Sequence, residues 1–308
     1  MDKTISVLQV IVPILTAIFL GVLARRKQTV TPEGIRGLQQ FVMNIGLPCI
    51  IFNSCLTANV GVESLGTMGL VMPFMIVITL WSFRARKTKF PFHNFPQLFS
   101  SQETGMLGIP LFIILFGSTH AYRMGILDLT QAVAAYPTIA ILSANAGDNP
   151  TPGQILKKVL TSPLLIMSTL GLTLNLSGLG SVLQNIGIGS IITESTGFLA
   201  QPVSALMIFS VGYNFALSSG NIKTVLRICL IHFFAFATIG LIVQLGLFLI
   251  PAVTAETRWS VLLFSLLPAS YLAPTLGRTE EDFTVASSVC SILTVVTLLV
   301  FCIMVVIV

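Results

Sequence analysis

The sequence predicts an all-α membrane protein with ten transmembrane helices. Its 308 residues are 54% hydrophobic and 9% charged, whereas soluble domains carry about 25% charged residues. Apolar segments of about twenty residues, the helix length that crosses a hydrocarbon core of roughly 30 Å, recur along the whole chain. The basic residues gather in alternate connections between these segments, as the positive-inside rule predicts for a multi-pass protein.

Ten apolar windows define the expected spans. The first ends in Arg25, Arg26 and Lys27 without a small-residue cleavage site, so we expect it to remain as a helix and not to be removed as a signal peptide. The windows are 5–24, 35–56, 65–83, 95–115, 123–144, 161–177, 190–216, 225–250, 259–276 and 283–308.

The basic residues predict the orientation. Thirteen of the sixteen lysines and arginines lie in the connections after the odd-numbered windows, and Lys3, Arg123 and Arg258 lie on the other side. We therefore expect an inner (plasma) membrane protein with both termini outside the cytoplasm. This placement accounts for the formal charge of +5 without nucleic acid as a partner. The thirteen residues are Arg25, Arg26, Lys27, Arg36, Arg84, Arg86, Lys87, Lys89, Lys157, Lys158, Lys223, Arg227 and Arg278.

A glycine- and proline-rich connection at 145–158 divides the predicted spans into five and five. We expect a first five-helix repeat at 1–146, a cytoplasmic linker at 147–160 and a second five-helix repeat at 161–308. With an odd number of spans in each half, the second repeat must be inverted relative to the first.

Helix breakers occur at corresponding positions of the two halves. Gln102–Leu111 places a carboxylate, two glycines and a proline in window four, and Pro268–Pro274 places two prolines in window nine. Pro110 and Pro268 are separated by about half the chain, as are Pro48 and Pro202. Proline removes a backbone donor and clashes with the preceding turn, and glycine adds no side chain to stabilise a helix. We therefore predict that windows four and nine are broken helices on a substrate pathway.

Several motifs point to one family of membrane transporters. Window four contains Gly-Met-Leu-Gly-Ile-Pro-Leu at 105–111, Asp128 follows in window five, and the second half contains 267–269 and 286–288, which read Leu-Pro-Ala and Ala-Ser-Ser. The opening block contributes Pro13, Leu20, Gly21, Arg25, Arg26, Leu38, Phe41, Val42, Asn44, Leu47, Pro48 and Phe52. With these residues the chain resembles the auxin efflux carrier family, most specifically in the opening block.

The resemblance implies both an architecture and an activity. It implies two inverted five-helix repeats whose broken helices 4 and 9 cross near the membrane centre, as in bile acid symporters and sodium/proton antiporters. It also implies transport of a small organic anion, such as a carboxylate or an auxin-like acid. Two positions depart from the family pattern: Glu103 stands where many members carry asparagine, and 276–279 replaces the usual exit from the second broken helix.

Glu103 and Asp128 are the candidate groups for ion coupling. A carboxylate near the bilayer centre costs about 2.5–3.5 kcal/mol on insertion scales, so it should be protonated, paired or hydrated. Coupling to H+ or Na+ is one interpretation of Glu103; a structural carboxylate that caps the broken half-helix or pairs with Gln102 is the other. Asp128 has a similar claim to ion coupling, and the alternative for it is a position nearer the membrane interface, because window five is short. The two carboxylates are candidates for neighbours in space.

The substrate site is expected where the broken helices expose amides that favour anions and carbonyls that favour cations. Four members have structural alternatives: close packing for the two glycines, interfacial anchoring for Tyr271, and a hydrogen bond to a carbonyl freed by Pro48 for Asn44. The predicted substrate-binding residues are Asn44, Gln102, Glu103, Gly105, Gly108, Pro110, Pro268, Ser270 and Tyr271.

Other function classes fit the sequence poorly. No catalytic, metal-binding or nucleotide-binding pattern is present, so we expect neither an enzyme nor a bound cofactor. His232 and the five cysteines, all in apolar windows, are expected to be packed residues. The prediction is a secondary transporter working by alternating access, with the lipid bilayer and a small organic anion as partners and a homodimer left open. A receptor or sensor with a transporter fold, and a passive channel, are the alternatives.

Overall fold

The computed structural model describes residues 3–58, 61–143, 153, 154, 157, 160–215, 222–250 and 253–308. About 84% of the chain is helical, and the described part contains no strand. The predicted all-α class is therefore confirmed. Most of the predicted linker at 147–160 lies outside the described residues.

The described helices fall into two sets, one on each side of this linker. The first set is α1 (Lys3–Lys27), α2 (Pro32–Phe41), η1 (Val42–Gly46), α3 (Leu47–Leu56), α4 (Val62–Thr88), α5 (Gln97–Ser100), η2 (Thr104–Gly108), α6 (Ile109–Phe116), η3 (Ser118–His120) and α7 (Tyr122–Ser143). The second set is α9 (Pro163–Leu176), α10 (Leu179–Asn185), α11 (Ile188–Ala200), α12 (Val203–Asn214), α13 (Ile222–Gly246), η4 (Leu247–Leu249), α14 (Ala255–Ser265), η5 (Pro274–Leu276) and α15 (Glu280–Ile307).

Six helical stretches among the described residues are long and apolar enough to cross a membrane. A seventh is added if α9 and α10, which are bent by 80° relative to each other, count as one span. The six stretches coincide with the predicted windows two, three, five, seven, eight and ten. The protein is thus an integral multi-pass membrane protein, while the count of ten spans and the inverted relation of the halves stay predictions.

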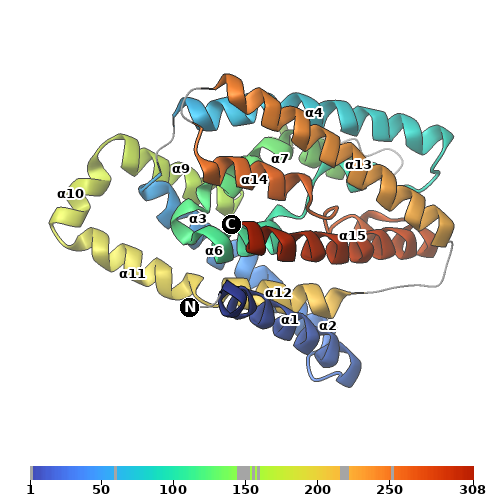
Figure 1. Ribbon diagram of the computed structural model, residues 1–308, viewed down its shortest axis with the longest axis horizontal. Coiled ribbons are helices and arrows are strands. Elements are labelled where there is room, and N and C mark those ends of the chain that lie inside the picture. Colours follow the sequence, from blue (N-terminus) through green and yellow to red (C-terminus); the bar gives the residue numbers. More distant parts are fainter. Residues whose placement is uncertain are drawn as a thin grey trace.

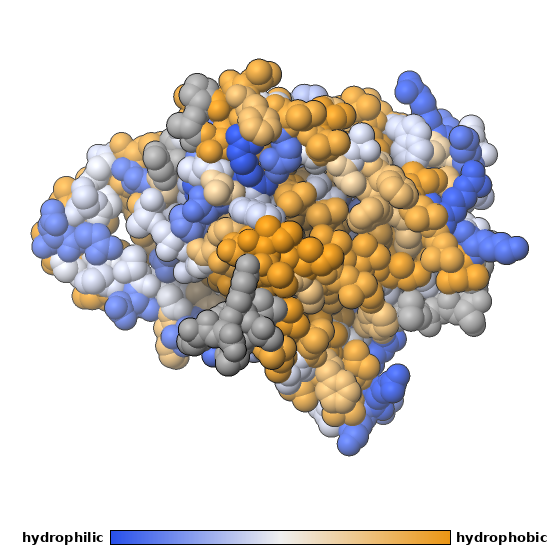
Figure 2. All heavy atoms as spheres, viewed as in Figure 1, coloured by the Kyte–Doolittle hydropathy of each residue, from blue (hydrophilic) through white to orange (hydrophobic). Residues whose placement is uncertain are grey.

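Large apolar side chains point outward from the long helices. On α13, Phe234, Leu241 and Leu245 are 62%, 61% and 60% exposed. Figure 2 shows hydrophobic residues across the middle of one face and hydrophilic residues toward its edges. An apolar surface of this extent is unfavourable in water and matches the hydrocarbon core of a bilayer.

The helices pack in two groups, and each group combines both halves of the chain. In one group α1 lies along α12 and α3 lies along α9. In the other, α4 lies along α7, and α13 contacts α4, α14 and α15. Figure 1 shows α1, α2 and α12 together at the bottom of the view and α4 and α13 at the top. The packing groups therefore do not coincide with the two sequence halves.

Windows four and nine are both interrupted, and the interruptions pair with each other. The helical backbone stops at Ser100 and resumes at Thr104, and it stops again at Ser265 before η5. Gln102 and Ala269 form an antiparallel bridge between the two extended segments. In this bridge the Glu103 N–H donates to the Pro268 carbonyl over 2.8 Å, and the Ser270 N–H donates to the Ser101 carbonyl over 3.1 Å.

The break in window four differs in position from the prediction. It lies at 101–103, whereas Gly105, Gly108 and Pro110 belong to the helix that follows. Pro110 is tolerated because it comes directly after the π-helical turn η2, in which the Ile109 N–H donates to the Thr104 carbonyl. A π-turn widens the helix and so removes the clash that proline causes in a regular α-helix. Pro48 follows η1 in the same way.

Gly108 provides close packing between η2 and the second interrupted segment. A Cβ atom at Gly108 would lie 2.6 Å from a methyl carbon of Leu267 and 2.9 Å from the Met124 methyl carbon. Both neighbours are buried, at 2% and 0% exposure. The close-packing interpretation therefore applies to Gly108, whereas at Gly105 the nearest atom, in Met43, would be 3.5 Å away.

We predict that Gly108→Ala destabilises the protein by about 1–3 kcal/mol, because buried side chains must shift to admit the methyl group. Gly105→Ala is the matched control, since its methyl group would make ordinary van der Waals contacts. Thermal unfolding in detergent measures both variants. Equal melting temperatures for the two would contradict the packing described for Gly108.

Candidate functional site

The segment at 101–103 is hydrogen-bonded along both edges. One edge faces the second interrupted segment, as described above. On the other edge, Gln131 of α7 accepts a hydrogen bond from the Gln102 N–H over 2.7 Å and donates one to the Gln102 carbonyl over 3.0 Å. A single side-chain amide thus takes the place of a neighbouring strand. This satisfies backbone groups that the bilayer interior would leave without partners.

The Glu103 carboxylate connects the two interrupted segments. One oxygen accepts a hydrogen bond from the Met106 N–H over 3.2 Å, which caps the helical turn η2. The other accepts from the Tyr271 N–H over 2.6 Å. Glu103 is 7% exposed. The capping role proposed for this residue is therefore present in the structure.

The two interrupted segments, 101–103 and the segment between Ser265 and η5, form what we call the crossing. The Gln102 side chain is a polar group of this crossing without hydrogen-bond partners in the described part of the chain. It is 2% exposed, and neither its nitrogen nor its oxygen has a hydrogen-bond partner among the described residues. The alternative pairing of Glu103 with Gln102 is therefore wrong. A buried amide without partners costs free energy, so such a group usually has a functional explanation. Gln102 offers one donor group and one acceptor to a polar ligand.

Asp128 joins the same hydrogen-bond network from α7. Its carboxylate accepts a hydrogen bond from the Gln131 side chain over 2.9 Å, and the same Gln131 nitrogen donates to the Thr104 hydroxyl over 2.9 Å. Asp128 is partly exposed, unlike the buried Gln131. Gln131 thus hydrogen-bonds to Asp128, to Thr104 and to the backbone of Gln102, the residue before Glu103.

A cavity of about 280 Å³ reaches the crossing at Tyr271. The Tyr271 hydroxyl is 2.7 Å from the Thr294 hydroxyl, and its N–H is the group bound by Glu103. Residues of α2, α12 and α15 line the cavity, with Arg36, Gln39 and Asn214 among its polar members. Tyr271 therefore belongs to a polar cavity next to the interrupted helices.

The predicted site residues fall into three groups. The crossing brings together Gln102, Glu103, Pro268, Ser270 and Tyr271. Gly105, Gly108 and Pro110 shape the helix that follows the break. Asn44 is exposed on η1, and its neighbour Met43 would contact a Cβ atom at Gly105, so Asn44 lies near the crossing but outside it.

Two residues of the site, Gln131 and Thr294, were not predicted from the sequence. Gln131 follows Asp128 by three residues in an apolar window, and such a pair lies on one face of a helix. That spacing was the available indication. Thr294 gave no comparable indication, because single threonines are common in membrane helices. His232, as expected, is packed: it is 1% exposed and lies between the rings of Phe99 and Phe236.

A second polar network joins the N-terminal ends of α4, α7 and α14. Glu63, in the first turn of α4, accepts hydrogen bonds from the N–H and the hydroxyl of Thr254 over 2.9 and 2.6 Å. Arg123, at the start of α7, lies 3.9 Å from Glu63 and donates to Thr254 and Thr257, over 2.9 and 3.0 Å. These contacts hold the ends of α4, α7 and α14 together.

The interrupted helices are a feature found in membrane transport proteins. Such breaks, with their polar backbone satisfied inside the protein, occur in many secondary transporters and also in channels. The sequence model of the family described as "Membrane transport protein", the domain of the auxin efflux carriers, matches residues 6–149. Residues 6–149 are therefore similar to that family, which is a family of transporters. No curated protein matches the chain.

We predict that Gln131→Leu destabilises the protein by about 1–3 kcal/mol, because the buried Gln102 N–H loses its hydrogen-bond partner, whereas the Gln102 carbonyl keeps the Thr104 N–H at 2.8 Å. Thr138→Val is the matched control: Thr138 is also buried on α7, but its hydroxyl bonds within its own helix, to the Ala134 carbonyl. The free energy of unfolding in detergent distinguishes them. The assigned role of Gln131 is wrong if its variant unfolds no more easily than the control.

Proposed function

We propose that the protein is a secondary transporter that moves a small organic anion, a carboxylate or an auxin-like acid, by alternating access. The observation that carries the proposal is the crossing of two interrupted helices at Gln102 and Ala269 in a chain whose residues 6–149 match a family of membrane transport proteins. In many secondary transporters the substrate site lies where such broken helices meet.

The cavity at Tyr271 supports an anionic substrate. Arg36 lies at its lining, exposed at the α2 end, where a positive charge attracts an anion. Gln39, Asn214 and the Tyr271 hydroxyl add polar groups to an otherwise apolar wall. This mixture suits an organic anion that has one charged group and an apolar body.

The two ends of the molecule support alternating access. The cavity lies among the ends of α2 and α12 that are expected to face the cytoplasm, whereas the Glu63 and Arg123 network holds the opposite ends of α4, α7 and α14 together. A transporter must close one end while the other is accessible. We assign this arrangement to a state that is accessible from the cytoplasm of an inner (plasma) membrane, with both termini on the other side.

Ion coupling is proposed to run through the Asp128 and Glu103 network, with H+ or Na+ as the driving ion and without another cofactor. Both Glu103 oxygens already accept backbone hydrogen bonds. The Asp128 carboxylate accepts its hydrogen bond from a side chain, that of Gln131, so we assign it the role of receiving the incoming proton or cation.

Transport itself is tested in proteoliposomes. Uptake of a panel of radiolabelled organic carboxylates, with an imposed pH or sodium gradient, is expected to saturate and to accumulate one substrate above its external concentration. Flux that neither saturates nor accumulates would indicate a channel. Tight binding without any flux would indicate a receptor.

We predict that Asp128→Asn abolishes gradient-driven accumulation while leaving downhill exchange intact. Asparagine keeps an oxygen that accepts the Gln131 hydrogen bond, but it cannot take up or release a proton or neutralise a cation. Glu103→Gln, unlike Asp128→Asn, is expected to destabilise the fold. Its new NH2 group would face the Tyr271 or Met106 N–H, so that two donors would point at each other. Wild-type accumulation by Asp128→Asn would contradict coupling through this residue.

A further inference from the structure

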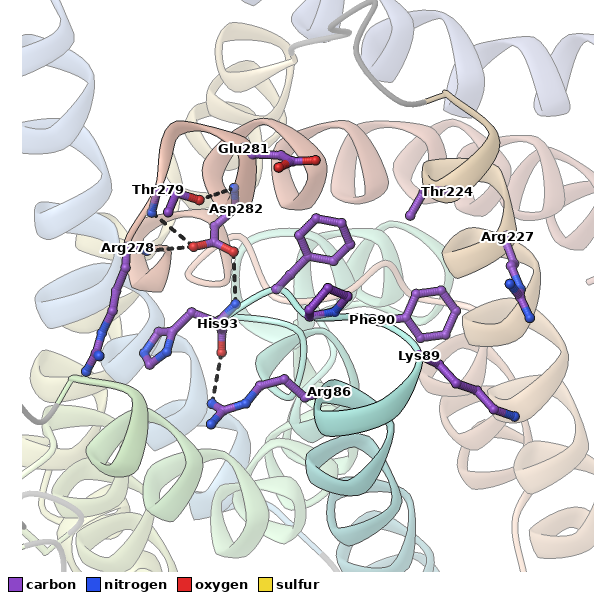
Figure 3. Close-up of a pocket in the computed structure, with 12 residues that line it drawn as sticks. Arg86, Lys89, Phe90, His93, Thr224, Arg227, Arg278, Thr279, Glu281 and Asp282 are labelled. Carbon is purple, nitrogen blue, oxygen red and sulfur yellow. Dashed lines mark hydrogen bonds between the residues drawn. The ribbon is translucent and has the colours of Figure 1, made fainter.

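A second and larger cavity lies away from the transport site. Its volume is about 670 Å³, and it shares no lining residue with the cavity at Tyr271. It is formed where α4 ends at Thr88, where α13 begins at Ile222 and where α15 begins at Glu280, together with the loop at 89–93. Figure 3 shows side chains of all these segments around one hollow.

The lining of this basic cavity is rich in cations. Arg86, Lys89, Arg227 and Arg278 contribute four positive charges, against two carboxylates. In Figure 3, Arg86 and Arg278 extend on one side of Phe90, Lys89 and Arg227 extend on the other, and Glu281 lies across the hollow on α15. The cations come from separate segments, so the fold, and not a local charge run in the sequence, gathers them.

The Asp282 carboxylate accepts hydrogen bonds from backbone N–H groups in the cavity wall. It accepts hydrogen bonds from the N–H groups of His93, Arg278 and Thr279, over 2.9, 3.0 and 3.0 Å. Figure 3 shows these bonds converging on the start of α15. Asp282 thereby fixes the loop at 89–93 against α15 and is occupied by these donors. The excess of positive charge in the cavity thus faces any anion that enters.

The position of the cavity points to a lipid. It lies at the ends of three apolar helices, which is the level of the headgroups in a bilayer. Directly beside Arg227 on α13, Leu226 and Leu230 are 46% and 57% exposed, and on α4 Leu80 is 57% exposed. Cations bordered by outward-facing leucines match an amphiphile with a negative headgroup and acyl chains.

We infer that this basic cavity binds the phosphorylated headgroup of an anionic lipid in the leaflet that the basic loops face. Lys89 and Arg227, which extend to the same side of Phe90, would pair with phosphate oxygens, and the exposed leucines of α13 and α4 would contact the acyl chains. Arg227 also lies over the Phe90 ring, with its guanidinium carbon 5.4 Å from the centroid, which holds this side chain at the cavity.

Native mass spectrometry of the purified full-length protein with added phosphatidylglycerol or phosphatidylcholine tests this inference. We expect preferential binding of phosphatidylglycerol, and a loss of about tenfold in its affinity in the Lys89→Gln, Arg227→Gln double variant. The matched control is Arg26→Gln with Lys27→Gln, which removes two exposed cations at the end of another membrane helix, away from the cavity.

Three results would overturn the inference. They are equal binding of the two lipids by the parent protein, an equal loss of affinity in the control variant, and competition by inorganic phosphate at the same concentration as the lipid, which would assign the cavity to a soluble phosphate compound. Because Arg227 contacts Phe90, the melting temperature in phosphatidylcholine is measured for every variant. Lys89→Gln alone changes an exposed side chain and keeps the test valid if the double variant does not fold.

Discussion

A backbone that leaves the helical conformation at membrane depth must find partners for its N–H and C=O groups inside the protein. The segment at 101–103 meets this constraint from three directions. The second interrupted segment pairs with Ser101 and Glu103, the Gln131 side chain pairs with Gln102, and the Gly108 N–H donates to the Glu103 carbonyl over 3.0 Å. The position of α7, the course of the second interrupted segment and the start of η2 all depend on these hydrogen bonds.

Glu103 connects the two interrupted segments through both of its carboxylate oxygens, which an asparagine could not do. A carboxylate accepts hydrogen bonds at both oxygens, and here each oxygen binds an amide of a different interrupted segment. Asparagine could accept only one such bond without turning a donor toward another donor. The departure of this chain from the residue common in the auxin efflux carrier family is therefore accompanied by a direct connection between the two segments, and Asp128 is the carboxylate for which we propose a coupling role.

The sequence predicted the class of protein, the two interrupted segments and several site residues for clear physical reasons. Apolar length reports membrane helices, and proline, glycine and charge within such a length report a break. The exact break was misplaced because a π-helical turn accommodates Pro110, and local sequence does not reveal such a turn. The Gln131 contact and the two cavities depend on segments that lie far apart in the chain, so they required the three-dimensional structure.

The crossing itself can be tested most directly by hydrogen exchange of the protein in lipid nanodiscs. The account predicts that the amides of Glu103, Ser270 and Tyr271, all hydrogen-bonded in the crossing, exchange slowly even though they lie outside regular helices. Peptides covering 99–106 and 267–273 report them. Exchange in both peptides as fast as in an exposed loop would contradict the paired crossing and the substrate site that we propose there.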